Sequence, residues 1–279
     1  MNPVTATVSY TLSEHQFLQI SNLVKGLCGI NLHEGKKELV KARLSKRLRI
    51  LGLTNFADYL DYIRDDSSGM ELTLMVDSLS TNLTSFFREM EHFNHLTDKV
   101  VKSPLHLSTR RLRVWSAGCS SGEEPYSIAI SLCESISDIM KWDVRILATD
   151  ISTRMLNRAK QGVYSPDRLD KMPRHLRSRY FTPIKLLEGT VFQVSNQLRS
   201  LVHFGWLNLM NPWPMKGLFD VIFCRNVMIY FDKPTQNKLV RRLFDILAPG
   251  GMLFIGHSES LAGVEHAFRY VIPTVYEKA

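Results

Sequence analysis

The chain has 279 residues, of which 44% are hydrophobic and 22% charged, and its formal net charge is +8 at pH 7. This composition excludes a largely disordered or low-complexity protein, and the length suits two ordinary domains. No apolar run approaches the roughly 20 residues of a membrane-spanning helix. The opening MNPVTATVSYTLSEHQF lacks the basic and apolar segments of a secretion signal, so we expect a cytoplasmic protein. The basic excess favours an acidic partner: nucleic acid, anionic lipid or an acidic protein.

Residues 1–87 are predicted to form an all-helical N-terminal domain. Phe17, Ile20 and Val24 recur at helical spacing after a capping signal at Thr11 or Ser13. The next apolar positions continue the same periodicity, and no strand-like alternation interrupts it. The helices are expected over Thr11–Val24, Lys36–Leu51, Phe56–Ile63 and Met70–Leu79.

A linker is expected over 88–110, followed by a second domain over 111–279 in which strands alternate with helices. The strands are predicted at Leu112–Trp115, Val144–Ala148, Phe219–Cys224 and Met252–Ile255. Helices are predicted at Glu124–Ser135, Arg154–Lys160 and Gln236–Leu247. This alternation predicts an α/β fold with a doubly wound, mostly parallel sheet. Residues 178–198 break the rhythm and are typical of an inserted antiparallel β-hairpin.

The loop after the first of these strands carries the clearest sign of a ligand. Gly118 and Gly122 would let the backbone approach a ligand at a helix N-terminus. Glu123 and Glu124 would repel a pyrophosphate and favour an ammonium or sulfonium group. Asp150 ends the second strand, where a carboxylate takes ribose hydroxyls in nucleoside-binding sheets. A nucleoside with a cationic tail fits S-adenosylmethionine, whereas a tight turn with solvated acids is the structural alternative.

Four segments of the chain resemble the chemoreceptor glutamate methyltransferases of the CheR type. They are Thr81–Glu89, Gly122–Ser127, Phe223–Phe231 and Gly256–Glu259, and the similarity covers almost the whole chain. The resemblance implies the S-adenosylmethionine-dependent methyltransferase fold with a small all-α N-terminal domain. It also implies methyl transfer to receptor glutamates, giving glutamate 5-O-methyl esters for sensory adaptation in chemotaxis, and S-adenosylhomocysteine as the second product.

The resemblance further implies a set of cofactor-binding residues and two catalytic ones. The expected cofactor residues are Asn82, Thr84, Arg88, Glu123, Asp150, Asn208, Leu209, Arg225 and Asn226. Tyr230 is expected near the transferable methyl group, and Arg225 or Tyr230 would orient the incoming carboxylate. The division of cofactor contacts between Arg88 and Arg225 stays open. No metal is expected, because the four cysteines have no metal-site spacing and are interpreted as buried thiols.

Basic residues crowd the second predicted helix. Lys36, Arg43, Lys46 and Arg47 are interpreted as a docking surface for the acidic methylation helices of a receptor bundle, with a solvated helix face as the alternative. Charge reversal at Arg43 and Arg47 would then raise the Michaelis constant for receptor. No membrane insertion is expected, and nothing in the sequence requires an oligomer. In the family the hairpin insertion can bind a receptor C-terminal peptide, but the turn over Thr182–Gly189 has fewer glycines, which leaves tethering open.

Two other functions compete with the receptor methyltransferase. A methyltransferase of RNA is opposed by the lack of aromatic residues interleaved with the basic ones. Asn211–Pro214 is similar to the N-P-P-aromatic motif of nitrogen methyltransferases, but it precedes the strand at Phe219–Cys224 and is interpreted as a loop. A catalytically silent scaffold that binds the cofactor and the receptor array is the second competitor, because binding and catalytic residues largely coincide.

Overall fold

The computed structural model describes residues 10–279. Residues 1–9, which are part of the opening segment on which the expectation about secretion rests, lie outside the described residues. Within 10–279, no helix is both long and apolar enough to cross a membrane. The chain divides into two compact units: residues up to Thr81 together with Tyr230–Asp232, and Asn82–Ile229 together with Lys233–Ala279.

The first unit is helical, as the sequence predicts. It contains α1 (Glu14–Cys28), the 3-10 turn η1 (Glu34–Lys36), α2 (Lys37–Leu51), α3 (Phe56–Asp65) and α4 (Met70–Leu79). Ser13 caps α1, since its hydroxyl accepts from the Gln16 N–H while the Gln16 side chain accepts from the Ser13 N–H. The buried side chains of α1 and α2 are the predicted apolar stripes, which include Phe17, Ile20, Val24, Val40, Leu44 and Leu48. These stripes form the core of the unit.

The segment Tyr230–Asp232 belongs to this helical unit although the chain enters it from strand β7 of the other one. Ile30 and Phe231 form an antiparallel bridge, and the Asn31 N–H donates to the Tyr230 carbonyl at 2.8 Å. Asp232 forms an ion pair of 2.8 Å with Lys25. Tyr230 is therefore held by backbone contacts with the helical unit.

The second unit is built on a seven-stranded sheet of order β6-β2-β1-β7-β8-β10-β9. The strands are β1 (Arg111–Ala117), β2 (Asp143–Asp150), β6 (Val202–Trp206), β7 (Phe219–Cys224), β8 (Leu247–Ile255), β9 (Phe268–Ile272) and β10 (Val275–Lys278). The first five strands of that order pair in parallel, and β10 is antiparallel to β8 and β9. Every residue of β7 is buried, as a central strand requires. The predicted mostly parallel sheet is confirmed.

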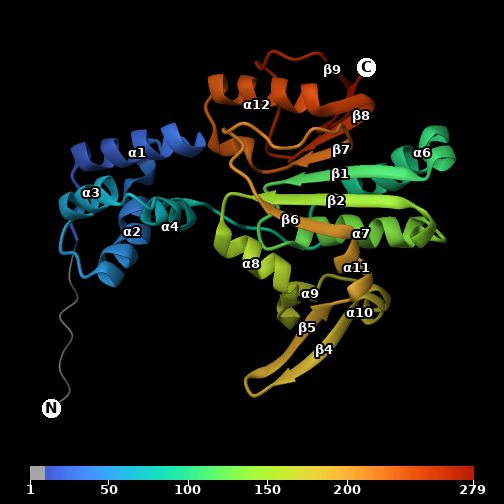
Figure 1. Ribbon diagram of the computed structural model, residues 1–279, viewed down its shortest axis with the longest axis horizontal. Helices are drawn as coiled ribbons and strands as arrows, with labels where there is room; N and C mark the ends of the chain where they lie inside the picture. Colours follow the sequence, from blue (N-terminus) through green and yellow to red (C-terminus); the bar gives the residue numbers. More distant parts are fainter. Residues whose placement is uncertain (1–9) are drawn as a thin grey trace. The chain divides into compact units, whose positions relative to one another are not determined.

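Helices cover both faces of this sheet. Figure 1 shows α7 (Glu123–Ser135) and α8 (Thr153–Gln161) on the β1–β2–β6 side, with α12 (Lys233–Ile246) beside β7 and β8. The strand order reverses between β1 and β7. In open α/β sheets a ligand binds at such a reversal, outside the carboxyl ends of the strands. The loops after β1, β2, β6 and β7 therefore lie where a ligand binds in sheets of this kind.

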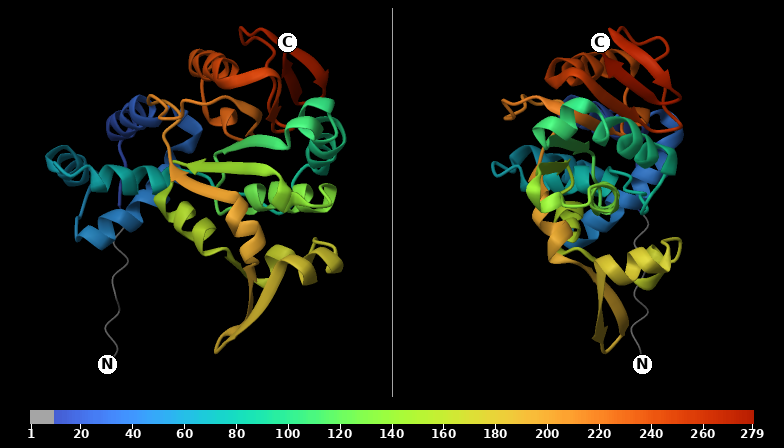
Figure 2. Two further views of the ribbon diagram at one scale, coloured as in Figure 1. Left: turned by 45° about the vertical axis from the view of Figure 1, so that its right-hand side comes forward. Right: turned by 90° about the vertical axis from the view of Figure 1, so that its right-hand side faces the viewer.

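The predicted hairpin insertion is present. Strands β4 (Phe181–Leu186) and β5 (Gly189–Val194) pair in antiparallel register, and β3 (Val163–Tyr164) adds a short third strand. The short helices α9 (Pro166–Leu169), α10 (Arg174–Tyr180) and α11 (Asn196–Leu201) flank the hairpin. Figure 2 shows this small sheet projecting from the rest of the second unit.

The segment 88–110, expected as a linker, is instead part of the second unit. It contains α5 (Met90–His95), the π-helix η2 (Leu96–Val101) and α6 (Pro104–Thr109). Phe93, Leu96 and Val100 are buried in the core of the sheet domain. Their i, i+3, i+7 spacing is a helical signal that the sequence contained.

Candidate active site

The loop after β1 is held in place by the end of β2. The Ser120 N–H donates to the Asp150 carboxylate at 2.7 Å, and the other oxygen of Asp150 accepts from the Ser152 N–H at 2.8 Å. Gly122 has φ of 97°, and a Cβ there would lie 2.9 Å from the side chains of Ala159 and Tyr164. Only glycine fits this turn. The predicted neighbourhood of the glycine loop and Asp150 is thus present in the structure.

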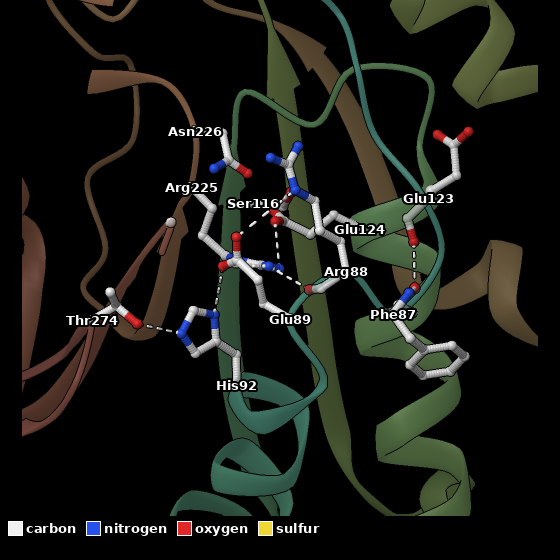
Figure 3. A network of polar contacts seen from close by, with 12 residues as sticks. Phe87, Arg88, Glu89, His92, Ser116, Glu123, Glu124, Arg225, Asn226 and Thr274 are labelled. Atoms are coloured by element: carbon white, nitrogen blue, oxygen red, sulfur yellow. Dashed lines mark hydrogen bonds and ion pairs between the residues drawn. The ribbon is translucent and has the colours of Figure 1, made fainter. Parts of the chain in front are cut away.

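The two adjacent acids of this loop point in different directions. Glu123 is fully buried, accepts from the Ser121 hydroxyl at 2.7 Å and is paired with Arg168. Glu124 accepts from the Ser116 hydroxyl at 2.7 Å and lies 3.2 Å from Nη1 of Arg225. Figure 3 shows the Glu123 carboxylate directed away from the Glu124–Arg225 contact. Burial raises the pKa of Glu124, and the Arg225 charge opposes that rise.

Arg225, which follows β7, is balanced by two carboxylates. Its Nη2 lies 2.9 Å from the Glu89 carboxylate and also donates to the Arg88 carbonyl, while its Nη1 contacts Glu124 (Figure 3). Only 2% of the Arg225 side chain is exposed. Burial raises the pKa of Glu89, but the Arg225 charge and hydrogen bond outweigh it and hold that pKa below its ordinary value. We call Glu89, Glu124 and Arg225 the buried charge network.

Arg88 differs from Arg225 in its accessibility. Its side chain is 34% exposed, donates to the Leu83 carbonyl at 3.0 Å and approaches Glu89 only to 3.8 Å. A guanidinium in this state keeps donors for a ligand, whereas most of the donors of Arg225 contact protein groups. Arg88 is therefore the better placed of the two for an anionic ligand group.

Glu259 organises the loop that follows Arg225. Its carboxylate accepts four backbone N–H groups, from Asn226 at 2.8 Å, Met228 at 2.7 Å, Ile229 at 3.3 Å and Gly256 at 2.5 Å. Asn226 has φ of 58°, a conformation that a side chain disfavours. The Glu259 hydrogen bonds hold this strained loop in one shape.

The adenine-side pair predicted after β6 is also fixed by local bonds. The Asn208 side chain accepts from the Met210 N–H at 2.9 Å, and the Leu209 carbonyl accepts from the Trp213 indole at 3.2 Å. Arg242 donates to that same carbonyl at 2.5 Å and lies 4.0 Å from the Trp213 ring centre. The segment Asn211–Pro214 is thus a loop before β7, as interpreted from the sequence.

The first motif also reaches the loop after β1. The Asn82 carbonyl accepts from the Ser120 hydroxyl at 3.1 Å, and Thr84 is half-buried nearby in the chain. Among the described residues, six other than glycine have positive φ, and five of them are Phe87, Glu89, Ser120, Asn226 and Thr274. Such strain gathers at functional sites because the surrounding structure must enforce it. Its concentration here marks these loops as the candidate site.

His92 adds a buried neutral group beside the network. It is 1% exposed, its Nε2 lies 2.7 Å from the Thr274 hydroxyl, and its Nδ1 lies 3.6 Å from Glu89. Ligand atoms of Glu89, His92 and His257 lie within 4.8 Å of one another, which is close enough for a metal ion. The Arg225 guanidinium already contacts the same Glu89 oxygen, and a second cation there would be repelled. We therefore interpret these groups as part of a charge network.

The buried state of His92 predicts a pH dependence of stability. Burial, reinforced by the Arg225 charge, lowers the pKa of His92 to about 3. The unfolded chain binds this proton below a pKa of ~6.5, so the contribution of neutral His92 to stability is lost as pH falls from ~6.5 toward 3. Between pH 7.5 and 5.5 wild type should lose about 1–1.5 kcal/mol more unfolding free energy than His92→Gln. Urea titrations at both pH values measure this, and equal losses would contradict it.

Comparison with known proteins identifies the family. Residues 15–80 match the CheR methyltransferase, all-alpha domain, and residues 82–276 match the CheR methyltransferase, SAM binding domain. The chain belongs to the CheR methyltransferase family. It is 44% identical to chemotaxis protein methyltransferase 2 of Pseudomonas aeruginosa over 100% of this chain and 98% of the relative. It is 39% identical to the chemotaxis protein methyltransferases of Borreliella burgdorferi (97% and 96% covered) and Escherichia coli K12 (97% and 93% covered).

This CheR-family chain is a methyltransferase whose cofactor is S-adenosylmethionine. The residues in the site fit that molecule. Within the described residues, Arg225 Nε and Asn226 Nδ2 are buried without a hydrogen-bond partner, beside the loops at the strand-order reversal. Asp150 stands at the end of β2, where ribose hydroxyls bind in this class of sheet. The acidic groups of the site and its buried nitrogen donors without a partner together suit a ligand that has both an ammonium and a carboxylate group.

The basic residues expected for docking have unequal roles in the helical unit of this CheR-family protein. The Arg47 side chain is 14% exposed and forms an ion pair of 2.5 Å with Glu71. The Glu71 carboxylate also accepts a hydrogen bond from the Tyr59 hydroxyl. Arg43 donates to backbone carbonyls at the end of α4. Lys36 lies 5.4 Å from the Tyr230 ring centre. Of the four, Lys46 alone is exposed, and no side-chain bond of Lys46 is seen within residues 10–279.

Sequence reasoning missed several residues that build the site. Glu89 and Glu259 both fall inside the motifs that carry the resemblance, but the resemblance implies no role for either. The positions of Ser116 and His92 gave no signal of their function. The partners of Glu89 and His92 lie far away in the chain: Arg225 is 136 residues from Glu89, and Thr274 is 182 residues from His92. Motif spacing carries no information about such pairs.

Proposed function

We propose that this protein methylates chemoreceptors, transferring a methyl group from S-adenosylmethionine to glutamate side-chain carboxylates as 5-O-methyl esters. Its membership of the CheR family and its nearly full-length likeness to chemotaxis protein methyltransferases support the substrate. The observation that carries the proposal is the buried charge network beside the glycine loop and Asp150. It brings the first motif, the loop after β1 and the end of β7 to one place.

The cofactor contacts are assigned by chemistry. When bound, S-adenosylmethionine supplies a methyl group activated by a sulfonium charge. Arg88 would hold its carboxylate, because this guanidinium is accessible while Arg225 is engaged. Asp150 would take the ribose hydroxyls, Asn208 and Leu209 the adenine, and Asn226 the methionine portion. Thr84 and Asn82 would cover the ligand, and Glu124 would attract its ammonium group. Glu123, which the resemblance assigns to the cofactor, is fully buried and paired with Arg168, so it would act on the ammonium only through the shape of the loop.

The receptor glutamate needs little activation from the enzyme. At pH 7 a glutamate carboxylate is almost wholly ionised and already nucleophilic, so no general base is required. The residues of the site then have to align this carboxylate and limit its hydration. The Tyr230 hydroxyl is the candidate for that alignment, and Arg225 fixes the start of the same loop.

Tyr230→Phe should lower kcat by about tenfold while leaving S-adenosylhomocysteine affinity nearly unchanged, since one hydrogen bond to a charged group is lost. Single-turnover methylation and calorimetric binding measure the two quantities separately. A tenfold weaker affinity with an unchanged single-turnover rate would contradict the proposed alignment role of the Tyr230 hydroxyl.

Receptor docking is tested on the exposed cations of α2. Arg43 and Arg47 are unsuitable for charge reversal because both make internal contacts. Lys46→Glu with Arg49→Glu should raise KM for a receptor fragment about tenfold and weaken its salt dependence. Lys238→Glu with Arg241→Glu, exposed at the same spacing on α12, is the matched control. Equal effects of the two double variants would exclude a specific docking face.

Peptide mapping by mass spectrometry tests the proposed substrate. After incubation with S-adenosylmethionine and a receptor cytoplasmic fragment, we expect glutamate residues that carry one added methyl group. Methylation at lysine, arginine or a nucleic acid would refute the assignment. Cofactor binding without any transfer to several receptor fragments would favour the silent scaffold.

A further inference from the structure

Arg43 forms hydrogen bonds with the chain at the end of α4, although its charge alone would suggest an exposed side chain. Its Nη1 donates to the Leu79 carbonyl at 2.7 Å and to the Ser80 carbonyl at 3.1 Å. Both terminal nitrogens lie 3.3 Å from the Thr81 hydroxyl. All three acceptors belong to the last residue of α4 and the two residues after it. Arg43 thus holds the point at which the chain leaves the helical unit.

The geometry of this contact is demanding. The last carbonyls of a helix have no partner within it, and a cation stabilises them. A guanidinium is planar and presents several donors at fixed angles, so it fixes the direction of the chain that it binds. A lysine at position 43 would supply the positive charge but not the several donors at fixed angles. The Arg43 contacts therefore fix the direction of the chain after α4 and also stabilise its carbonyl groups.

The chain held by Arg43 continues directly into the first motif. Thr81 is the last residue of the helical unit before Asn82 opens the second one. The Asn82 carbonyl accepts from the Ser120 hydroxyl, and the Ser120 N–H donates to Asp150. Two consecutive residues are thus anchored, Thr81 by Arg43 and Asn82 by the loop after β1.

We propose that Arg43 is a positioning residue for the cofactor site, acting through Leu79–Thr81 on the segment from Asn82 to Arg88. The inference rests on the proposed function for the role of that segment in holding the cofactor. It differs from a docking role, in which Arg43 would affect only receptor binding.

Calorimetric titration with S-adenosylhomocysteine, with no receptor present, separates the two roles. Arg43→Gln should weaken binding by about tenfold, and Arg43→Lys should give an intermediate loss, because each removes part of a charge-assisted contact. Lys41→Gln is the matched control: it removes the same charge from the same helix, where the Lys41 ammonium pairs with the exposed carboxylate of Glu38. That variant should keep its affinity within about twofold. Unchanged affinity in folded Arg43→Gln, together with a higher KM for receptor, would overturn the proposal.

Hydrogen exchange supplies a second readout if Arg43→Gln folds poorly. In Arg43→Lys the amides of residues 82–88 should exchange faster than in wild type, while those of α1 should not change. Uniformly faster exchange in both segments would mean general destabilisation and would also overturn the positioning role. If wild type binds S-adenosylhomocysteine but methylates no receptor, the proposed substrate fails while the Arg43 comparison keeps its meaning. Absence of binding by wild type would contradict both.

Discussion

Arg225→Met is expected to lower the free energy of unfolding by about 3–5 kcal/mol, the cost of breaking a buried ion pair from one side. The substitution leaves the carboxylates of Glu89 and Glu124 buried, with only 10% and 13% of their side chains exposed, and without their shared cation. Arg225→Met should therefore also raise the pKa of both acids. Urea denaturation at pH 7 measures the loss, and methylation activity should fall with it.

Two comparisons make this prediction specific. Arg88→Met removes the same charge from a half-exposed position and should cost less than about 1 kcal/mol of stability while weakening cofactor affinity. Adding Glu89→Gln and Glu124→Gln to Arg225→Met should restore part of the stability, because no unpaired charge then remains. A loss below about 1 kcal/mol for Arg225→Met would show that the buried charge network has the strength of a surface pair.

Glu259→Gln should lower the free energy of unfolding by about 2–4 kcal/mol, since two backbone N–H groups, one of them buried, lose their acceptor. One carboxylate oxygen accepts from Asn226 and Gly256, and the other from Met228 and Ile229. A glutamine keeps one of these oxygens and turns an NH₂ group toward the other pair of donors. The loop from Arg225 to Tyr230 should then lose its shape, and kcat should fall.

Ser258→Ala is the matched control for Glu259→Gln. Ser258 is the preceding residue, is exposed and makes no side-chain bond seen within residues 10–279. Its replacement should change stability by less than about 0.5 kcal/mol and leave kcat unchanged. Similar effects of both substitutions on stability and kcat would refute a specific role of the Glu259 carboxylate.

The architecture could be predicted because burial leaves a periodic trace in the sequence. The stripe Val40, Leu44 and Leu48 located α2, and the apolar run of β7 marked a strand buried on both faces. The turn chemistry around Leu187 placed the hairpin. The strands β9 and β10 left a weaker trace, because their exposed and half-buried residues do not alternate regularly. The helices within 88–110 were not predicted, although Phe93, Leu96 and Val100 are spaced as on one face of a helix.

The site was less predictable than the fold, because side-chain partners are set by tertiary structure. The sequence placed Glu123 and Glu124 together, but only the structure pairs Glu123 with Arg168 and Glu124 with Arg225. In the sequence, Arg43, Lys46 and Arg47 are three equivalent positive charges on one helix. In the structure, Arg47 is paired with Glu71, whereas Lys46 is exposed. Spacing along a helix reports which face a residue occupies. It does not report which acid lies opposite.

The chemistry of the product tests the transfer of a methyl group to a receptor carboxylate most directly. The protein is incubated with methyl-labelled S-adenosylmethionine and a receptor cytoplasmic fragment, and the labelled receptor is then treated with mild alkali. We expect the label to be released as volatile methanol, because a glutamate methyl ester hydrolyses under these conditions. Label that stays on the receptor after alkali would show methylation of nitrogen and contradict the account.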